Sequence, residues 1–282
     1  MYQTIAFCIL SSLGIFSLIH GFETATRSDR REVLSSILTA FILFYLAVNI
    51  YLNVASLLSL IITLSIPITV IFIAILNIFK PLFQKIKLRI GKHVKDSKTR
   101  EVLRKLFHLL SLVLIVAYAY YGEEITIQLT YLALIFFYFT DILRFWMPKY
   151  YPFAVIADLV LRKGETEKIG PHTYYVISAS LALMLFSTYI AVIALIAAAI
   201  GDASAAIAGK TLGKHKLPWK KEKTVEGSIA AFVTTFITLT LFTIVEKALI
   251  GAALLLIIDL IDPPVNDNLL NGLAIAAGLT LF

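Results

Sequence analysis

The chain has 282 residues, of which 59% are hydrophobic and only 15% are charged. Soluble domains carry roughly a quarter charged residues, so this composition excludes an ordinary soluble fold. The net charge of +7 does not indicate a nucleic-acid partner, because the basic residues form blocks between apolar runs, where they set membrane orientation.

Apolar runs about as long as a bilayer is thick follow one another along the chain and predict about nine or ten membrane helices. They cover residues 2–21, 33–52, 54–79, 106–121, 124–146, 172–188, 189–208, 227–245, 247–261 and 269–282. The first run has no basic segment before it and no small-residue cleavage site, so we expect a retained span and not a signal peptide. The predicted fold class is therefore an all-α polytopic membrane protein.

Lys and Arg residues concentrate in two loops, at 80–105 and 210–223. The positive-inside rule places both loops in the cytoplasm. If each successive helix crosses the membrane in the opposite direction, loops 22–32, 147–171 and 262–268 also lie inside and both termini lie outside. Every polar, motif-like loop then lies on one face, which predicts a single cytoplasmic site.

The densest polar signal consists of the stretches Gly201–Ala206, Gly209–Lys214 and Lys223–Ser228. Small residues let the backbone approach a phosphate, lysines neutralise it, and a carboxylate can hold the magnesium ion that bridges its oxygens. Close helix packing is the alternative explanation for the glycine spacing. Asp202 argues against packing alone, because an ionisable group at the end of an apolar run is costly.

The stretch Lys223–Ser228 immediately precedes an apolar run. Its Thr224, Glu226 and Ser228 can cap the following helix while the free N–H groups of that helix face an anion; a role in capping alone is the alternative. Residues 204–211 nearly match a P-loop, but Ser204 stands at the first required glycine and a membrane helix precedes it. We therefore reject a Walker A motif.

Further ionisable residues fall on the same predicted face. Asp141 and Arg144 are three residues apart, which puts them on one helix face as an ion pair, and a purely structural role is the alternative. His108 lies just inside a span, and Asp267 and Asn268 follow a short loop with two prolines. No His/Cys set has zinc-ligand spacing and no Ser-His-Asp arrangement is recognisable.

Together these residues resemble the CTP-binding signature of the dolichol kinase, phytol kinase and yeast-type diacylglycerol kinase family. The most specific part is Lys-Thr-x-Glu-Gly-Ser at residues 223–228, and the resemblance covers about residues 100–282. It implies transfer of the γ-phosphate of CTP to a membrane lipid alcohol, with Mg²⁺, at a site open to the cytoplasm. Residues 100–282 would form the kinase-family core, and 1–99 the scaffold spans and basic loop of the same continuous membrane domain.

The expected roles divide the residues into three sets. The catalytic residues would be Asp202, Glu226, Asp141 and His108. The metal ligands would be Asp202, Glu226 and Asp267. The nucleotide would contact Gly201, Ser204, Gly209, Lys210, Gly213, Lys214, Lys223, Thr224, Gly227, Ser228 and Asn268.

Two other functions stay open. An enzyme similar to CTP:phosphatidate cytidylyltransferase also handles CTP and lipid but forms a CDP-lipid, and this sequence lacks the long acidic and glycine-rich C-terminal signature of that class. A secondary transporter would place carboxylates near the membrane midplane, whereas here they are predicted at cytoplasmic helix ends.

Overall fold

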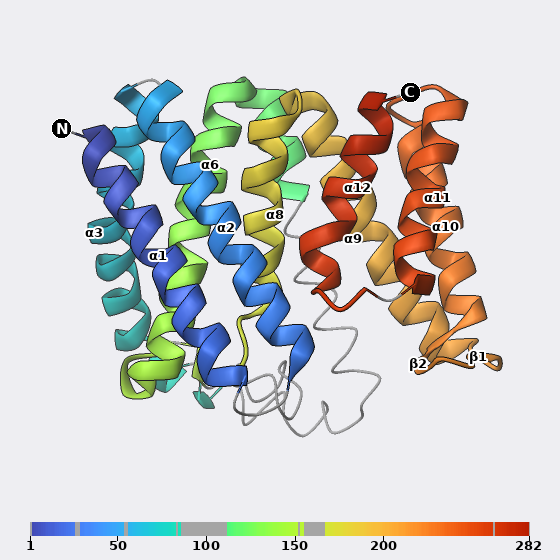
Figure 1. Cartoon of the computed structure of the whole chain (residues 1–282), viewed down its shortest axis with the longest axis horizontal. Coiled ribbons are helices and arrows are strands. Elements are labelled where there is room, and N and C mark those ends of the chain that lie inside the picture. The colour runs from blue at the N-terminus through green and yellow to red at the C-terminus, as the bar shows by residue number, and fades with distance from the viewer. Residues whose placement is uncertain are drawn as a thin grey trace. The chain divides into compact units, whose positions relative to one another are not determined.

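The computed structural model describes residues 2–25, 29–53, 56–82, 84–85, 112–151, 153–154, 167–261 and 263–281. Apart from one short hairpin, the long elements of this part of the chain are helices (Figure 1). Five of the described helices are long and apolar enough to cross a membrane. These helices agree with the predicted all-α membrane class.

The described helices begin and end within a few residues of predicted apolar runs. In chain order they are α1 (Tyr2–Ala25), α2 (Arg30–Asn53), α3 (Ser56–Ile78), α6 (Leu112–Trp146), α8 (Pro171–Leu185), α9 (Thr188–Thr211), α10 (Val225–Thr240), α11 (Val245–Ile261) and α12 (Asp267–Leu281). A 3₁₀ turn, η2 (Pro148–Tyr150), follows α6. The break predicted near Gly122 is present inside α6, where Gly122 has a φ of 80° that L side chains rarely adopt.

The chain divides into two compact units. Unit 1 comprises residues 1–100 and 128–177, and unit 2 comprises residues 101–127 and 178–282. Packing groups residues 128–177 with the N-terminal helices. Helices α6 and α8 each contribute to both units.

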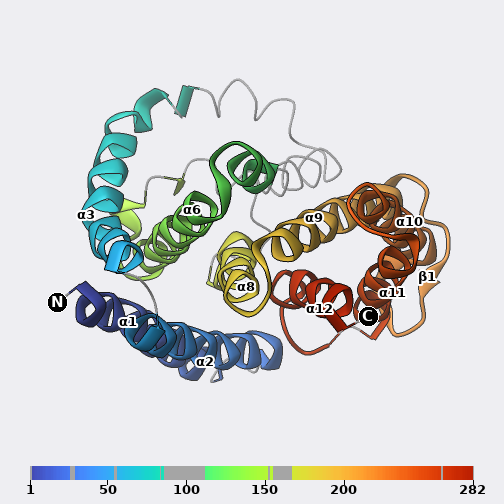
Figure 2. The same cartoon turned by 90° about the horizontal axis from the view of Figure 1, so that it is seen from above.

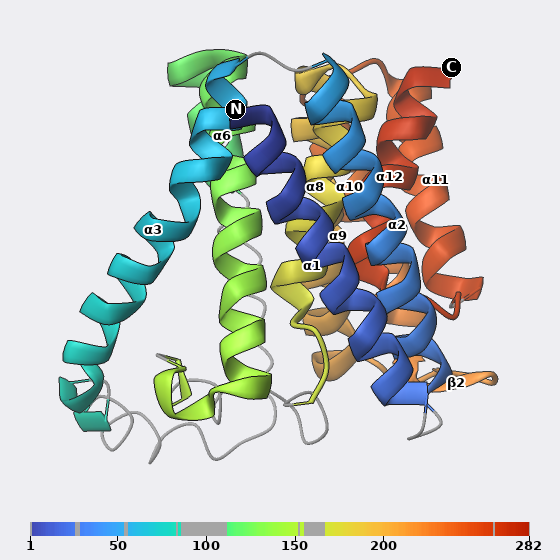
Figure 3. The ribbon, with the colours of Figure 1, turned by 60° about the vertical axis from the view of Figure 1, so that its left-hand side comes forward.

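In unit 1, α1 lies beside α2 and also contacts α3 (Figure 3). Small residues bring α1 and α2 together: a methyl group at Gly14 would lie 3.2 Å from the Phe44 ring, and one at Gly21 would lie 3.3 Å from Ser36 Cβ. Close backbone approach of this kind is the main means by which helices associate in lipid.

In unit 2, α9 packs mainly against α10 and α12, and α11 packs against α10 and α12 (Figure 2). Residues 191–199 of α9 are all buried, and five of them are alanines. The short side chains let neighbouring helices approach this segment of α9 closely.

One end of unit 2 carries the connection from α9 to α10. Because consecutive helices alternate in direction, α9 and α11 end there, and α10 and α12 begin there. An antiparallel hairpin of β1 (Lys216–Leu217) and β2 (Lys220–Thr224), which the sequence did not predict, joins α9 to α10. Helix α9 continues to Thr211, so Asp202 lies roughly 14 Å inside the helix end and not at it.

Candidate functional site

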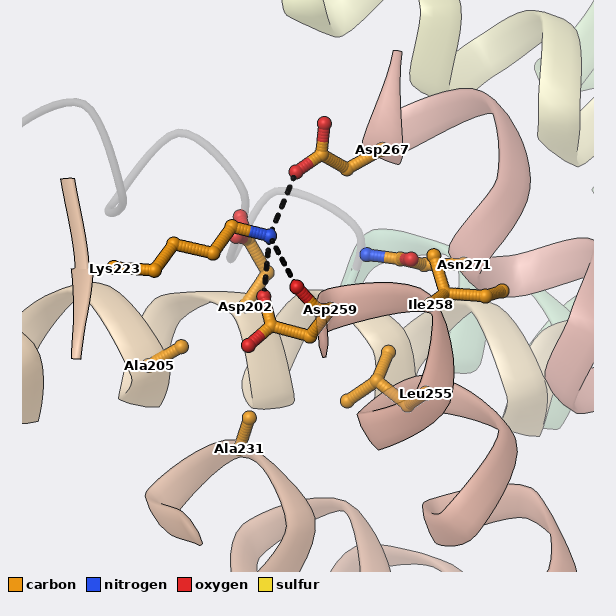
Figure 4. Close-up of a pocket in the computed structure, with 9 residues that line it drawn as sticks. All are labelled: Asp202, Ala205, Lys223, Ala231, Leu255, Ile258, Asp259, Asp267 and Asn271. Carbon is orange, nitrogen blue, oxygen red and sulfur yellow. Dashed lines mark hydrogen bonds and ion pairs between the residues drawn. The ribbon is translucent and has the colours of Figure 1, made fainter. Parts of the chain in front are cut away.

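A pocket at this end of unit 2 collects polar residues from four separate elements (Figure 4). Its lining consists of Asp202, Ala205, Lys223, Ala231, Leu255, Ile258, Asp259, Asp267 and Asn271. Asp202, Lys223 and Asp267 come from three stretches that the sequence marked as motif-like. The fold thus brings together residues that are up to 65 positions apart in the chain.

The Lys223 ammonium group lies among the carboxylates of this pocket (Figure 4). Its Nζ donates to Asp259 Oδ1 at 2.5 Å and to the Asp259 main-chain carbonyl at 3.1 Å. A third oxygen, Oδ2 of the Asp267 carboxylate, lies 3.5 Å away. The Lys223 side chain is only 20% exposed, so these charges interact with limited screening by water.

Asp259, like Asn271, is a polar pocket residue to which the sequence analysis assigned no role. Its second oxygen, Oδ2, accepts a hydrogen bond of 2.5 Å from Ser228 Oγ, so Asp259 links β2, α10 and α11. One signal could have found it: like Asp202, it is a carboxylate near the end of an apolar run, where an ionisable group is costly.

Three carboxylates and one ammonium group give the pocket lining a formal charge of −2. Such a pocket repels a bare triphosphate and favours one that arrives with a divalent cation. The Oδ1 atom of Asn271 is buried and has no hydrogen-bond partner within the described part of the chain. Unsatisfied buried oxygens are costly, so this atom is suited to a cation or a donor group supplied by a ligand.

Carboxylate and amide oxygens are the kinds of donor that Mg²⁺ takes. Among the described residues, no three His, Cys, Asp or Glu side chains form a complete metal-binding group. Mg²⁺ does not require one, because it is usually held by one or two carboxylates together with substrate phosphates and water. Asp202 and Asp267 supply that number of carboxylates, with the Asn271 amide oxygen beside them.

Three N–H groups at the beginning of α10 already have acceptors within the chain. Thr224 is the N-cap residue, and its side chain accepts from Gly227 N at 3.2 Å. Val225 N donates to the His215 carbonyl at 2.9 Å. The Glu226 carboxylate accepts from its own N–H. The alternative of capping alone therefore describes these groups better than an anion site at the helix end.

Glu226 faces the hairpin and does not line the pocket. One of its oxygens lies 2.7 Å from His215 Nδ1, and both accept from the His215 N–H. The Glu226 main-chain N–H and the His215 ring lower the pKa of the Glu226 carboxyl to about 2. A carboxylate with so low a pKa is a weak base near neutral pH, so this geometry supports an anchoring role for Glu226.

The motif glycines provide helix packing. A methyl group at Gly227 would lie 2.8 Å from the Ala205 carbonyl and 3.3 Å from Gly209 Cα, so α9 and α10 touch there through their backbones. Methyl groups at Gly201 and Gly213 would meet Leu255 and Thr224 at 2.8 and 2.7 Å, respectively. The packing explanation for the glycine spacing fits these contacts.

The remaining predicted nucleotide contacts lie around the pocket and not in its lining. Lys210 and Lys214 are exposed near the end of α9. Ser204 Oγ donates to the Ile200 carbonyl at 2.8 Å, and Asn268 donates to Asn266 Oδ1 at 3.0 Å through its main chain.

Asp141 belongs to unit 1, where both of its oxygens are engaged. Oδ1 accepts from Arg144 at 2.6 Å, and Oδ2 accepts from Gly170 N at 2.8 Å and from Thr173 Oγ1 at 2.7 Å. The side chain is 1% exposed. These contacts fasten the beginning of α8 to α6, which matches the structural alternative for the Asp141–Arg144 pair.

A second buried carboxylate, Glu32, strengthens the same junction. It accepts from His20 Nε2 at 3.1 Å, from Ile169 N at 2.9 Å and from the Tyr174 hydroxyl at 3.1 Å. The adjacent N–H groups of Ile169 and Gly170 are thus held by two different carboxylates. The remaining predicted catalytic residue, His108, lies outside the described residues.

Comparisons with known protein families, with curated proteins and with solved structures found no match to this chain.

Proposed function

We propose that this chain is a CTP-dependent kinase that transfers the γ-phosphate to the hydroxyl of a membrane lipid alcohol. The observation that carries the proposal is the meeting of Asp202, Lys223 and Asp267 in one pocket, because each comes from a stretch that resembles the dolichol and phytol kinase signature. Packing alone does not require three carboxylates and a lysine in one pocket. The choice of CTP rests on the resemblance.

The proposed site would face the cytoplasm, with both termini outside and about nine or ten membrane helices in one domain. The acceptor would be dolichol, another polyprenol or a related isoprenoid alcohol, which reaches the pocket from the bilayer. The pocket itself holds about 10 Å³, room for roughly one water molecule or metal ion, so the nucleotide and the acceptor would lie largely at its open side.

In the proposed reaction, the lipid oxygen forms a bond to the γ-phosphorus as the bond from that phosphorus to the β–γ bridging oxygen breaks, and CDP leaves. Asp202 would take the hydroxyl proton or ligate Mg²⁺ together with Asp267. Lys223, whose four-carbon stem can move between partners, would contact the phosphates, with Lys210 and Lys214 at the entrance. Bound Mg²⁺ would neutralise charge on the phosphate oxygens.

Purified protein supplied with γ-labelled CTP or ATP, Mg²⁺ and a panel of lipid alcohols tests the proposal. Label should enter a lipid alcohol from CTP, and Asp202→Asn should abolish transfer. Glu246→Gln is the matched control, because Glu246 is an exposed carboxylate in the first turn of α11, at the opposite end of that helix from the pocket. Absence of transfer to every alcohol, or equal loss in the control, contradicts the proposal.

One observation favours a second function. Asp202 lies deeper in α9 than the sequence predicted, and a carboxylate pocket at that depth also suits cation-coupled transport. A protein that fails to phosphorylate lipids but shows cation-dependent solute uptake in proteoliposomes would favour this transporter function.

A further inference from the structure

The hairpin closes over the C-terminal end of α11. The last carbonyl groups of a helix have no partner within the helix. Two consecutive carbonyls of α11 are satisfied by the hairpin: Lys223 Nζ donates to that of Asp259 at 3.1 Å, and Trp219 Nε1 donates to that of Leu260 at 2.7 Å. The hairpin is therefore fixed on this helix end by two side chains.

Trp219 is held through the indole N–H at one edge of its ring, while most of the ring surface is exposed to solvent. It occupies the turn between the paired residues Leu217 and Lys220, of which Leu217 is only 4% exposed. The Trp219 side chain is 65% exposed although its one polar atom is bonded. Its position is fixed without burial of the ring, which leaves an apolar, π-electron-rich surface available to a partner.

This ring lies close to the pocket. Because Asp259 and Leu260 are adjacent, the indole nitrogen and the Lys223 ammonium are roughly 10 Å apart at most, given 3.8 Å between consecutive Cα atoms and the two measured hydrogen bonds. A nucleotide carries its base and its phosphates on opposite sides of one ribose. A nucleotide with phosphates at Lys223 therefore has its base within reach of Trp219.

We infer that the Trp219 indole is the platform on which the base of the nucleoside triphosphate stacks. The inference rests on the proposed function, which supplies the nucleotide. It adds the residue that would bind the base of that nucleotide. Stacking of a base on an aromatic side chain is tolerant of base identity, because every base has a π-face. Trp219 thus contributes affinity for the nucleotide and leaves the choice of base to other contacts.

Substitutions separate the ring from its hydrogen bond. Trp219→Phe and Trp219→Ala both lose the bond to Leu260, but only the former keeps an aromatic face. Trp219→Ala should raise the KM for CTP about 5- to 100-fold with kcat little changed, whereas Trp219→Phe should stay within about threefold of the parent. Inhibition by inorganic tripolyphosphate, which has no base, should be equal in all three proteins.

A binding measurement makes the inference testable even if no phosphate is transferred. The chain has two tryptophans, so Trp146→Phe leaves Trp219 as the sole indole fluorophore. Mg·CTP should quench its emission, and tripolyphosphate should not. If phosphate is transferred to lipid but CTP does not quench the Trp219 fluorescence, the inference is overturned and the kinase proposal stands. The same holds if phosphate is transferred and the KM for CTP is unchanged in Trp219→Ala. Quenching by brominated lipids but not by CTP would assign Trp219 to the membrane interface and would also overturn it.

Discussion

Replacing Lys223 by Met should destabilise the protein more than replacing its main partner, Asp259, by Asn. The Lys223 and Asp259 side chains are 20% and 18% exposed and meet at 2.5 Å. Loss of one partner of a well-buried ion pair costs about 3–5 kcal/mol, and one charge-assisted hydrogen bond contributes about 1.5–3 kcal/mol. Since a fifth of each side chain is still exposed, we expect about 3 kcal/mol for Lys223→Met.

Asp259→Asn should cost less, about 1–2 kcal/mol, because the amide oxygen can still accept from Lys223 or from Ser228, and Lys223 keeps Asp267 at 3.5 Å. The double variant should lose about 1–3 kcal/mol less unfolding free energy than the sum of the losses in the two single variants, because the two groups share one interaction.

Equilibrium unfolding of the four proteins by SDS in mixed micelles, followed by circular dichroism, measures these differences. Lys247→Met is the matched control, because Lys247 Nζ donates to a main-chain carbonyl, that of Leu279, at 3.0 Å. It should cost about 1 kcal/mol. Strictly additive effects of Lys223→Met and Asp259→Asn, or an equal cost for Lys247→Met, would refute the coupled-pocket reasoning.

Three further predictions use the same unfolding assay together with lipid phosphorylation. Asp141→Asn should lower stability by about 3 kcal/mol, because it leaves Arg144 in a buried site without its carboxylate, but should leave the KM for CTP unchanged; a changed KM with normal stability would contradict this. Gly227→Ala should cost about 1–3 kcal/mol, because the added methyl group meets the α9 backbone; a neutral effect would contradict the close approach. Gly122→Val should cost more than Gly122→Asn, because a β-branched residue tolerates a φ of 80° least while nothing lies within 4 Å of the added Cβ; equal costs would argue against backbone strain.

The helices could be predicted from the sequence because bilayer thickness and apolar composition together determine where a chain of this kind is helical. The break at Gly122 followed from the same pattern. The sequence placed the stretches that contain Asp202, Lys223 and Asp267 on one face of the membrane. The pocket contains all three residues.

The pairings within the site could not be predicted in the same way. Asp259 binds Ser228 and Lys223 across 31 and 36 residues, and nothing in the local sequence specifies those partners. Nor does the local pattern reveal that Glu226 bonds to His215 on the hairpin. These contacts depend on how α9, α10 and α11 pack, and that packing is set by small residues whose spacing also resembles a phosphate-binding stretch.

The most direct test of the central claim is a comparison of CTP labelled at the γ-phosphate with CTP labelled at the α-phosphate, in parallel reactions with Mg²⁺, a lipid alcohol and phosphatidate. The account predicts that only the γ-label enters lipid, as a lipid monophosphate, and that Asp202→Asn prevents it. Entry of the α-label with release of pyrophosphate would identify a CDP-lipid synthase, and entry of neither label would contradict a kinase at this pocket.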